Sequence, residues 1–88
     1  MANTKSAEKR IRQNAAARDR NRAHRSRLRT AIKRLRAAVD AGDAATAADL
    51  LPATLSIIDA TAQKKIIHPN TASRYKSRLA SHVHALPG

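Results

Sequence analysis

The fold is decided by residues 27–43, RLRTAIKRLRAAVDAGD. The large apolar side chains of this stretch recur at steps of three and four residues: Leu28, Ile32, Leu35 and Val39. That spacing places them on one face of an α-helix. Gly42 suits the left-handed position just past a helix end, and Asp43 suits the cap of a following helix. The stretch therefore predicts a helix, a tight turn and the start of a second helix.

Two further amphipathic helices are expected after this turn. Their apolar stripes are Leu51, Leu55, Ile58, Ala62 and Ile66 in the second, and Tyr75, Leu79, Val83 and Leu86 in the third. Only two Gly and three Pro interrupt a chain rich in Ala, Arg and Leu, a composition that favours helix over strand. We expect an all-α, three-helix bundle in a single domain, residues 1–88, with helices at about 6–41, 44–66 and 70–86.

The ends of these helices are less evenly marked. Ser6 is predicted to cap the first helix, with Glu8 in its first turn, and Asn70 to cap the third. Pro52 lies inside the second helical pattern, where it either kinks the helix or marks its true start one turn later. The sequence leaves these two alternatives open.

The first helix is much longer than the other two. At about 1.5 Å per residue the three would be roughly 54, 35 and 24 Å long, so the later helices cover only part of the first. Between Lys5 and Arg27 the only large apolar residue is Ile11. About 20 residues thus have no core to join. We expect them to form a projecting basic arm.

The charge of the chain is large and uneven. With 18 Lys and Arg against 6 Asp and Glu, the net charge is +12. Residues 1–36 hold 13 basic and 2 acidic side chains, residues 37–59 hold four acidic and no basic ones, and residues 60–88 hold five basic ones. So large an excess on a short chain indicates a polyanionic partner.

The arginines of the first helix occupy more than one face. One stripe is Arg18, Arg22, Arg25 and Arg29, and the opposite side carries Arg20, Arg27 and Arg34. A helix on a membrane or in one DNA groove needs cations on one face only, whereas folded RNA surrounds a helix with several phosphate backbones. A merely solvated helix would have only Glu8 and Asp19 as counter-charges. Like charges four residues apart destabilise a free helix, so the arm is expected to fray until RNA binds.

Other classes of function find little support. The chain has no Cys, no glycine-bounded nucleophile and too few glycines for a phosphate loop, so neither an enzyme nor a cofactor is expected. His82 and His84 lie about 200° apart on a helix and cannot share a metal ion. No apolar run spans a bilayer, and no hydrophobic segment follows Lys5 to form a secretory signal. Tyr75 is the only aromatic residue; its spacing indicates core rather than a base-stacking platform.

Two stretches of the chain carry a family pattern. The first is Met1–Arg10, MANTKSAEKR, with further matches at Asn21, Ser26, Arg29, Thr30 and Lys33. The second is Ile67–Asn70 with Ala72, Arg74, Lys76, Ser77, Arg78 and Leu79. With Ala41–Asp43 at the helix junction, they resemble, in matching order over nearly the whole chain, the bacterial small-subunit ribosomal protein family numbered twenty. Departures are Lys65, where that family commonly has Gly, Thr71, commonly basic, and Asp19, usually basic or neutral.

The resemblance implies a structural protein embedded in the RNA of the small ribosomal subunit, in the cytoplasm. Such proteins bind the RNA directly and early, help its 5′ domain fold, and reach the long helix near its 3′ end. They have few protein contacts and no homo-oligomer is expected. The resemblance assigns RNA contacts to Lys5, Lys9, Arg10, Asn21, Ser26, Arg29, Lys33, His68, Asn70, Arg74, Ser77 and Arg78. The basic arm itself adds Arg12, Arg18, Arg22, Arg25 and Arg27.

Two other interpretations remain open at this point. A nucleoid-type DNA-binding protein is the alternative among binding modules, because a charge of +12 attracts any nucleic acid. A membrane-active cationic helix belongs to a different class. The absence of a bulky apolar face in residues 5–27 argues against it.

Overall fold

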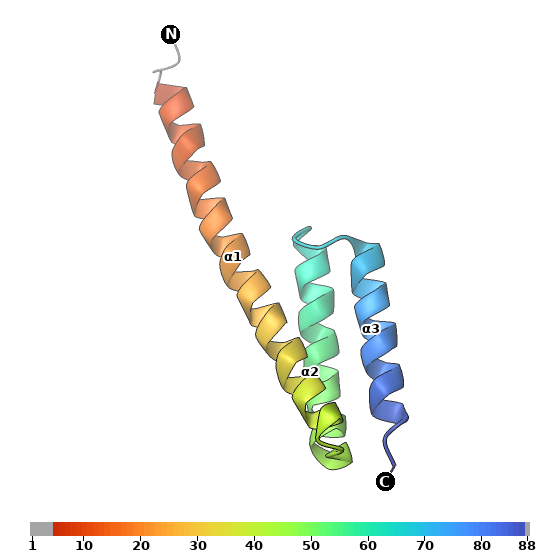
Figure 1. Cartoon of the computed structure of the whole chain (residues 1–88). Helices are drawn as coiled ribbons and strands as arrows, with labels where there is room; N and C mark the ends of the chain where they lie inside the picture. Colours follow the sequence, from red (N-terminus) through yellow and green to blue (C-terminus); the bar gives the residue numbers. More distant parts are fainter. Residues whose placement is uncertain (1–4, 88) are drawn as a thin grey trace.

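The computed structural model describes residues 5–87, and these form three helices with no strand among them (Figure 1). The helices are α1 (Lys5–Asp40), α2 (Ala44–Gln63) and α3 (Pro69–His84). The predicted all-α class and the extended first helix are confirmed. Glu8 lies in the first turn of α1, as expected, but Ser6 does not cap the helix, because the chain is already helical at Lys5.

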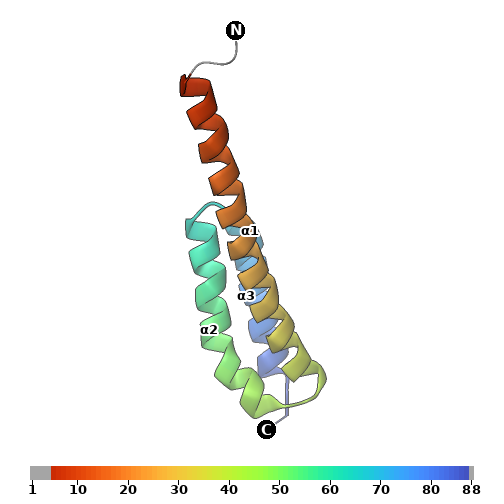
Figure 2. The ribbon, with the colours of Figure 1, turned by 90° about the vertical axis from the view of Figure 1, so that its left-hand side faces the viewer.

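The three helices lie side by side at one end of the molecule, and only α1 continues to the other end (Figures 1 and 2). Helices α2 and α3 lie beside the C-terminal half of α1, and the N-terminal half of α1 extends past them alone (Figures 1 and 2). The molecule is accordingly elongated, 65 × 21 × 15 Å. Helix α2 is the central element, because α1 and α3 each contact it extensively and contact each other little.

The core is small and confined to the bundle. Its most deeply buried large side chains are Leu35, Ile58 and Leu79, one from each helix. The remaining buried apolar residues are Leu28, Ile32, Ala38, Ala47, Ala72 and Val83. No core residue precedes Leu28 in the described part of α1, so the arm has no apolar backing.

The buried face of α2 differs from the predicted stripe. Its centre is formed by Ala47, Thr54, Ile58 and Thr61, while Leu51, Leu55 and Ala62 lie at its half-buried edges. The two threonines can be buried because their hydroxyls donate hydrogen bonds within the helix, from Thr54 to the Leu50 carbonyl at 2.8 Å and from Thr61 to the Ile57 carbonyl at 2.6 Å. Local bonding thus offsets the cost of burying a polar group.

The junction between α1 and α2 forms as predicted. Gly42 has φ +72°, the Gly42 N–H bonds to the Val39 carbonyl at 3.0 Å, and the Asp43 N–H bonds to the Ala38 carbonyl at 2.9 Å. Asp43 then caps α2 by accepting hydrogen bonds from the Thr46 hydroxyl and backbone N–H. These bonds hold the pKa of the Asp43 carboxyl below its ordinary value. The stabilisation they give is therefore present at neutral pH and is lost on acidification through that lowered pKa.

The end of α2 departs from the prediction. The helix stops at Gln63 rather than Ile66, because Lys65 adopts a left-handed conformation with φ 62°. The Lys65 N–H bonds to the Ala62 carbonyl and the Ile66 N–H to the Thr61 carbonyl, the same closing pattern that Gly42 provides for α1. Here a lysine occupies a backbone conformation that favours glycine.

Proline positions resolve two further questions. Helix α2 begins at Ala44, so Pro52 lies inside it and does not mark its start; Figure 2 shows α2 bending in its N-terminal half.

Pro69 is the first residue of α3, and the cap is His68 rather than the predicted Asn70. The His68 Nδ1 accepts a hydrogen bond from the Asn70 N–H at 3.0 Å. A proline suits this first helical position because it needs no N–H there.

Replacing Lys65 with glycine tests the strain at the end of α2. A left-handed non-glycine residue costs roughly 1–2 kcal/mol, and the extra unfolded-state entropy of glycine offsets about 0.5–1 kcal/mol of the relief. We expect Lys65→Gly to raise the free energy of unfolding by up to about 1 kcal/mol in thermal or urea denaturation. Lys65→Ala is the control, since it removes the same charge and keeps the strain. A Lys65→Gly variant no more stable than Lys65→Ala would contradict this account of the turn.

Candidate nucleic-acid interface

Two rows of arginines flank the core along α1. Arg25, Arg29 and Arg36 lie four and seven residues apart, close to whole turns of helix, and line a groove between α1 and α3. Arg27 and Arg34 lie on the other flank and line a shallower hollow that Ile57 of α2 closes. The arginines between Arg25 and Arg36 thus occupy two sides of α1.

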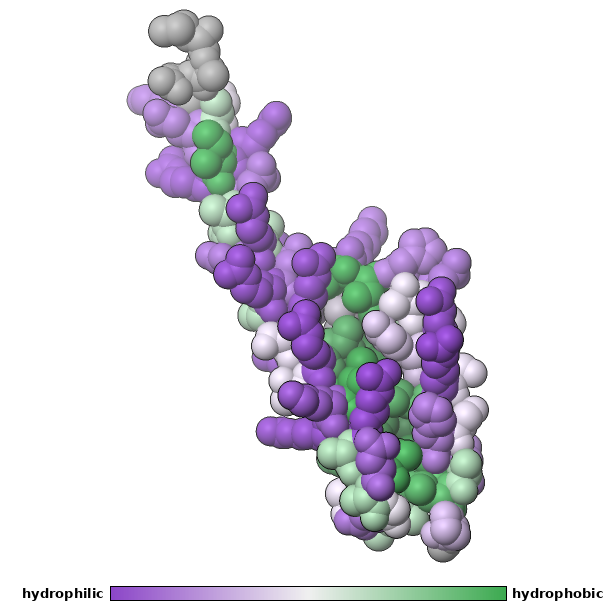
Figure 3. Space-filling view, viewed as in Figure 1, coloured by the Kyte–Doolittle hydropathy of each residue, from purple (hydrophilic) through white to green (hydrophobic). Residues whose placement is uncertain are grey.

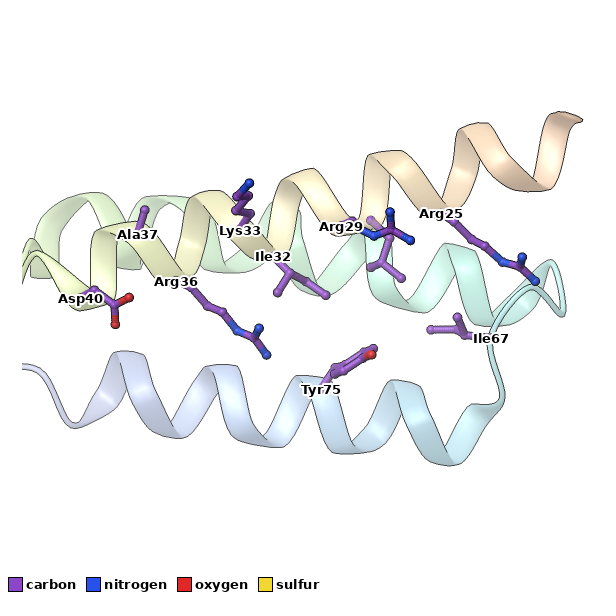
Figure 4. Close-up of a pocket in the computed structure, with 10 residues that line it drawn as sticks. Arg25, Arg29, Ile32, Lys33, Arg36, Ala37, Asp40, Ile67 and Tyr75 are labelled. Carbon is purple, nitrogen blue, oxygen red and sulfur yellow. The ribbon is translucent and has the colours of Figure 1, made fainter.

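The groove between α1 and α3 has a volume of about 640 Å³ and combines two kinds of surface. Arg25, Arg29 and Arg36 extend from α1 toward the gap, whereas Lys33 points away from it (Figure 4). The apolar lining comes from Leu28 and Ile32 of α1, Ile67 of the connecting turn and Tyr75 of α3. Asp40 lies at the far end of the groove. The groove exists because α1 and α3 both pack on α2 and hardly touch each other.

The arm consists of residues 5–27 of α1 and carries cations on several sides. Every Lys and Arg in it is exposed, and Ile11, at 68% exposure, is the one large hydrophobic side chain exposed in the described part of the chain. Figure 3 shows hydrophilic side chains radiating from the arm and continuing over the visible face of the bundle. Such a surface can meet phosphates from several directions at once.

The cations of α1 have no acidic partner in the part of the chain that the structure describes. Among residues 5–87 there is a single ion pair, in which Lys76 Nζ of α3 lies 2.8 Å from Asp59 Oδ1 of α2. It joins two helices of the bundle and leaves the cations of α1 without acidic partners. The charges of α1 are therefore not balanced by ion pairs along its surface among the described residues.

Comparison of the sequence with known proteins assigns the chain to a family. The model of the family described as ribosomal protein S20 matches residues 2–84. The chain belongs to the ribosomal protein S20 family. It is similar to the small ribosomal subunit protein bS20 of Burkholderia multivorans, with 56% identity over 86 residues, covering 98% of this chain and 96% of that protein. The bS20 proteins of Burkholderia thailandensis and Paraburkholderia phymatum are 54% and 51% identical, over 98% of this chain and 94% of each relative.

Membership of the S20 family confirms the resemblance seen in the sequence. The chain is a ribosomal protein and not an enzyme. Among the described residues there is no group of three or more His, Asp and Glu side chains that could hold a metal ion. In the same part of the chain, no helix is both long enough and apolar enough to cross a membrane.

The sequence-predicted RNA-binding residues lie on α1, on the turn before α3 and on α3. All are exposed except Asn21, which is half-buried where the arm meets the bundle. Those of α3 share one side of the helix, turned away from the buried Ala72, Leu79 and Val83: Asn70, Arg74, Ser77 and Arg78. The structure therefore does not gather the predicted set into one surface. His68 has its Nδ1 engaged as the cap of α3, which leaves the Nε2 edge of the ring for other contacts.

Two residues of the groove were missed by sequence reasoning. Arg36 was not among the predicted contacts, although it continues the stripe of Arg25 and Arg29 by two more turns, so helical spacing contained the signal. The spacing of Tyr75 predicts a core residue. It packs against the core but is only half-buried, and its ring points from α3 toward α1 and the groove (Figure 4). Nothing in its spacing reveals that open edge.

The charge of the arm predicts opposite effects on folding and on binding. Arg18 and Arg22 repel each other one turn apart, and such pairs cost an isolated helix about 0.2–0.5 kcal/mol. The double substitution Arg18→Gln, Arg22→Gln should increase the helicity of the free protein at low salt, measured by circular dichroism, and weaken its binding to RNA. The difference in helicity should vanish at about 1 M salt, where charges are screened. Lower helicity in the variant at low salt would refute the proposed repulsion.

Proposed function

We propose that this chain is a structural constituent of the small ribosomal subunit, acting in the cytoplasm, that binds small-subunit RNA directly and helps it fold. One observation carries the proposal: the cations of α1 are exposed on several sides and have no acidic partner among residues 5–87. The relatives named small ribosomal subunit protein bS20 support the same assignment.

The binding is mainly to phosphates. Ten of the 13 cations in residues 1–36 are arginines, whose planar group can hold a phosphate through two hydrogen bonds. A helix about 10–12 Å across, charged around its circumference, can be buried between several RNA backbones, where one duplex groove would leave half its charge unused. Such contacts position the RNA, and its folded shape supplies the specificity.

Different parts of the chain take different contacts in this proposal. The arm contributes Lys5, Lys9, Arg10, Arg12, Arg18, Asn21, Arg22, Arg25, Ser26 and Arg27, continued by Arg29 and Lys33 along the bundle. The turn and α3 contribute His68, Asn70, Arg74, Ser77 and Arg78. By family resemblance their targets are the 5′ domain and the long helix near the 3′ end of the RNA. The proposal includes few protein contacts, no self-association and no cofactor.

Binding measurements distinguish this function from its alternatives. We expect the protein at about 150 mM salt to bind small-subunit RNA more tightly than duplex DNA of equal length or anionic vesicles, measured by filter binding and vesicle sedimentation. Equal affinity for DNA and RNA would refute the proposal, and so would binding to vesicles alone.

The salt dependence of the same binding tests the use of the arm. Each phosphate contact adds roughly 0.7–0.9 to the slope of log affinity against log salt, so several contacts give a slope of several units. Replacing Arg12, Arg18 and Arg22 together with Gln should lower the slope by about 2–3. A slope near one in the unmodified protein would show that the arm is not used.

A further inference from the structure

We propose that the groove between α1 and α3 binds an unpaired nucleotide of the RNA, with its base against Tyr75 and its flanking phosphates on Arg25, Arg29 and Arg36. This proposal rests on the RNA-binding function above and names the RNA element that one part of the interface recognises. It differs from the phosphate contacts of the arm because the groove offers an apolar surface as well as cations.

The lining of the groove fits a nucleotide better than it fits a duplex. A duplex presents phosphates and sugars at its surface and keeps the faces of its bases stacked, so it cannot use an apolar floor. An extruded base exposes its faces, and aromatic or apolar side chains are the surfaces that it stacks on. Tyr75 provides the ring, with Ile32 and Ile67 beside it. The volume of about 640 Å³ lies within the roughly 300–1,000 Å³ usual for small-molecule sites.

The charges of the groove favour an anionic occupant and give it a direction. Three arginines reach toward the gap, and Asp40 is the one acidic residue that lines it. Arg25 lies at the end nearest the arm and Asp40 at the opposite end (Figure 4). A strand that follows the arginines of the arm therefore enters beside Arg25, and the repulsion of phosphates by Asp40 limits how far it extends. An amphipathic protein segment would need acidic groups facing all three arginines.

The walls of the groove are held in place by the fold. Leu28 and Ile32 are buried and fix the α1 side. On α3, Tyr75 packs against the core and points toward α1 (Figure 4), and the adjacent Lys76 pairs with Asp59 of α2. Ile67 lies between the two structures that fix the turn, the left-handed Lys65 and the His68 cap. The groove is thus formed before any ligand arrives, which lowers the entropic cost of binding.

A fluorescent base in a hairpin RNA tests this inference on the full-length protein. Two hairpins share the same loop and the same stem sequence. One carries a single unpaired 2-aminopurine bulged from the stem, and the stem of the other is fully paired. We expect tighter binding to the hairpin with the unpaired base and a change in its 2-aminopurine emission at saturation. Tyr75→Phe should retain both effects, and Tyr75→Leu should abolish the emission change and lose about five- to a hundredfold in affinity for that hairpin alone.

Matched charge variants locate the phosphates. Arg36→Gln removes a cation that lines the groove, and Arg34→Gln removes one that lines the opposite hollow two residues away. The ratio of affinities for the two hairpins should fall in Arg36→Gln and stay unchanged in Arg34→Gln. Circular dichroism shows whether each variant keeps the helix content of the unmodified protein, and binding to the fully paired hairpin measures the loss of general electrostatic attraction.

The outcomes separate the two proposals. If both hairpins bind equally and the 2-aminopurine emission does not change, the groove does not hold a base and this inference is overturned, while the RNA-binding function stands. A ratio that falls equally in Arg34→Gln and Arg36→Gln would also overturn it. Failure of small-subunit RNA to bind would instead remove the proposed function.

Discussion

The hydrophobic core of this protein reaches along α1 only as far as Leu28. Beyond that point, toward the N-terminus, the helix has no second surface on which to bury side chains, and nine of residues 5–27 are Lys or Arg, none with an acidic partner among residues 5–87. In a globular protein most of the stability of a helix comes from packing of its apolar face. The arm lacks that contribution and carries repulsion between like charges instead. In the function proposed above, bound RNA supplies the missing stabilisation, because its phosphates offset the repulsion between the cations of the arm.

The small size of the core also shapes the bundle. Each helix contributes one deeply buried large side chain to the core. Helices α1 and α3 both pack against α2 and make little contact with each other. The groove that results is open on the flank where the arginines of α1 lie. In a larger core this gap would be filled by apolar side chains. Here the incomplete contact between α1 and α3 leaves a partly apolar groove beside the arginines of α1.

Much of this could be predicted from the sequence, and the failures have physical causes. The apolar spacing of α1 and the Gly42–Asp43 pair predict the first junction correctly, because both depend on local geometry. Helix α2 ends three residues before the predicted end, because Lys65, a residue type that gives no turn signal, adopts the left-handed conformation. The cap of α3 also differs from the prediction, because His68 takes the role expected of Asn70, a commoner capping residue. Hydropathy also missed Thr54 and Thr61 at the centre of the buried face of α2, since their hydroxyls are satisfied locally.

The sequence predicts the charged surface of α1 but not the groove between α1 and α3. The multi-sided charge of α1 follows from helical periodicity alone, and the exposure of nearly every predicted residue agrees with it. The groove depends on how α1 and α3 lie relative to each other, which periodicity does not determine. Helical spacing extends the arginine stripe to Arg36, but the groove that Arg36 and Tyr75 line forms only when the helices pack together.

The central claim is that the arm is stabilised by RNA and not by the rest of the chain. Residue-resolved hydrogen exchange of the free and the RNA-bound protein measures this directly. The account predicts rapid amide exchange in residues 5–27 of the free protein, slow exchange in residues 28–40, and strong protection of the arm when RNA binds. Arm amides that are already as protected as those of residues 28–40 without RNA would contradict it.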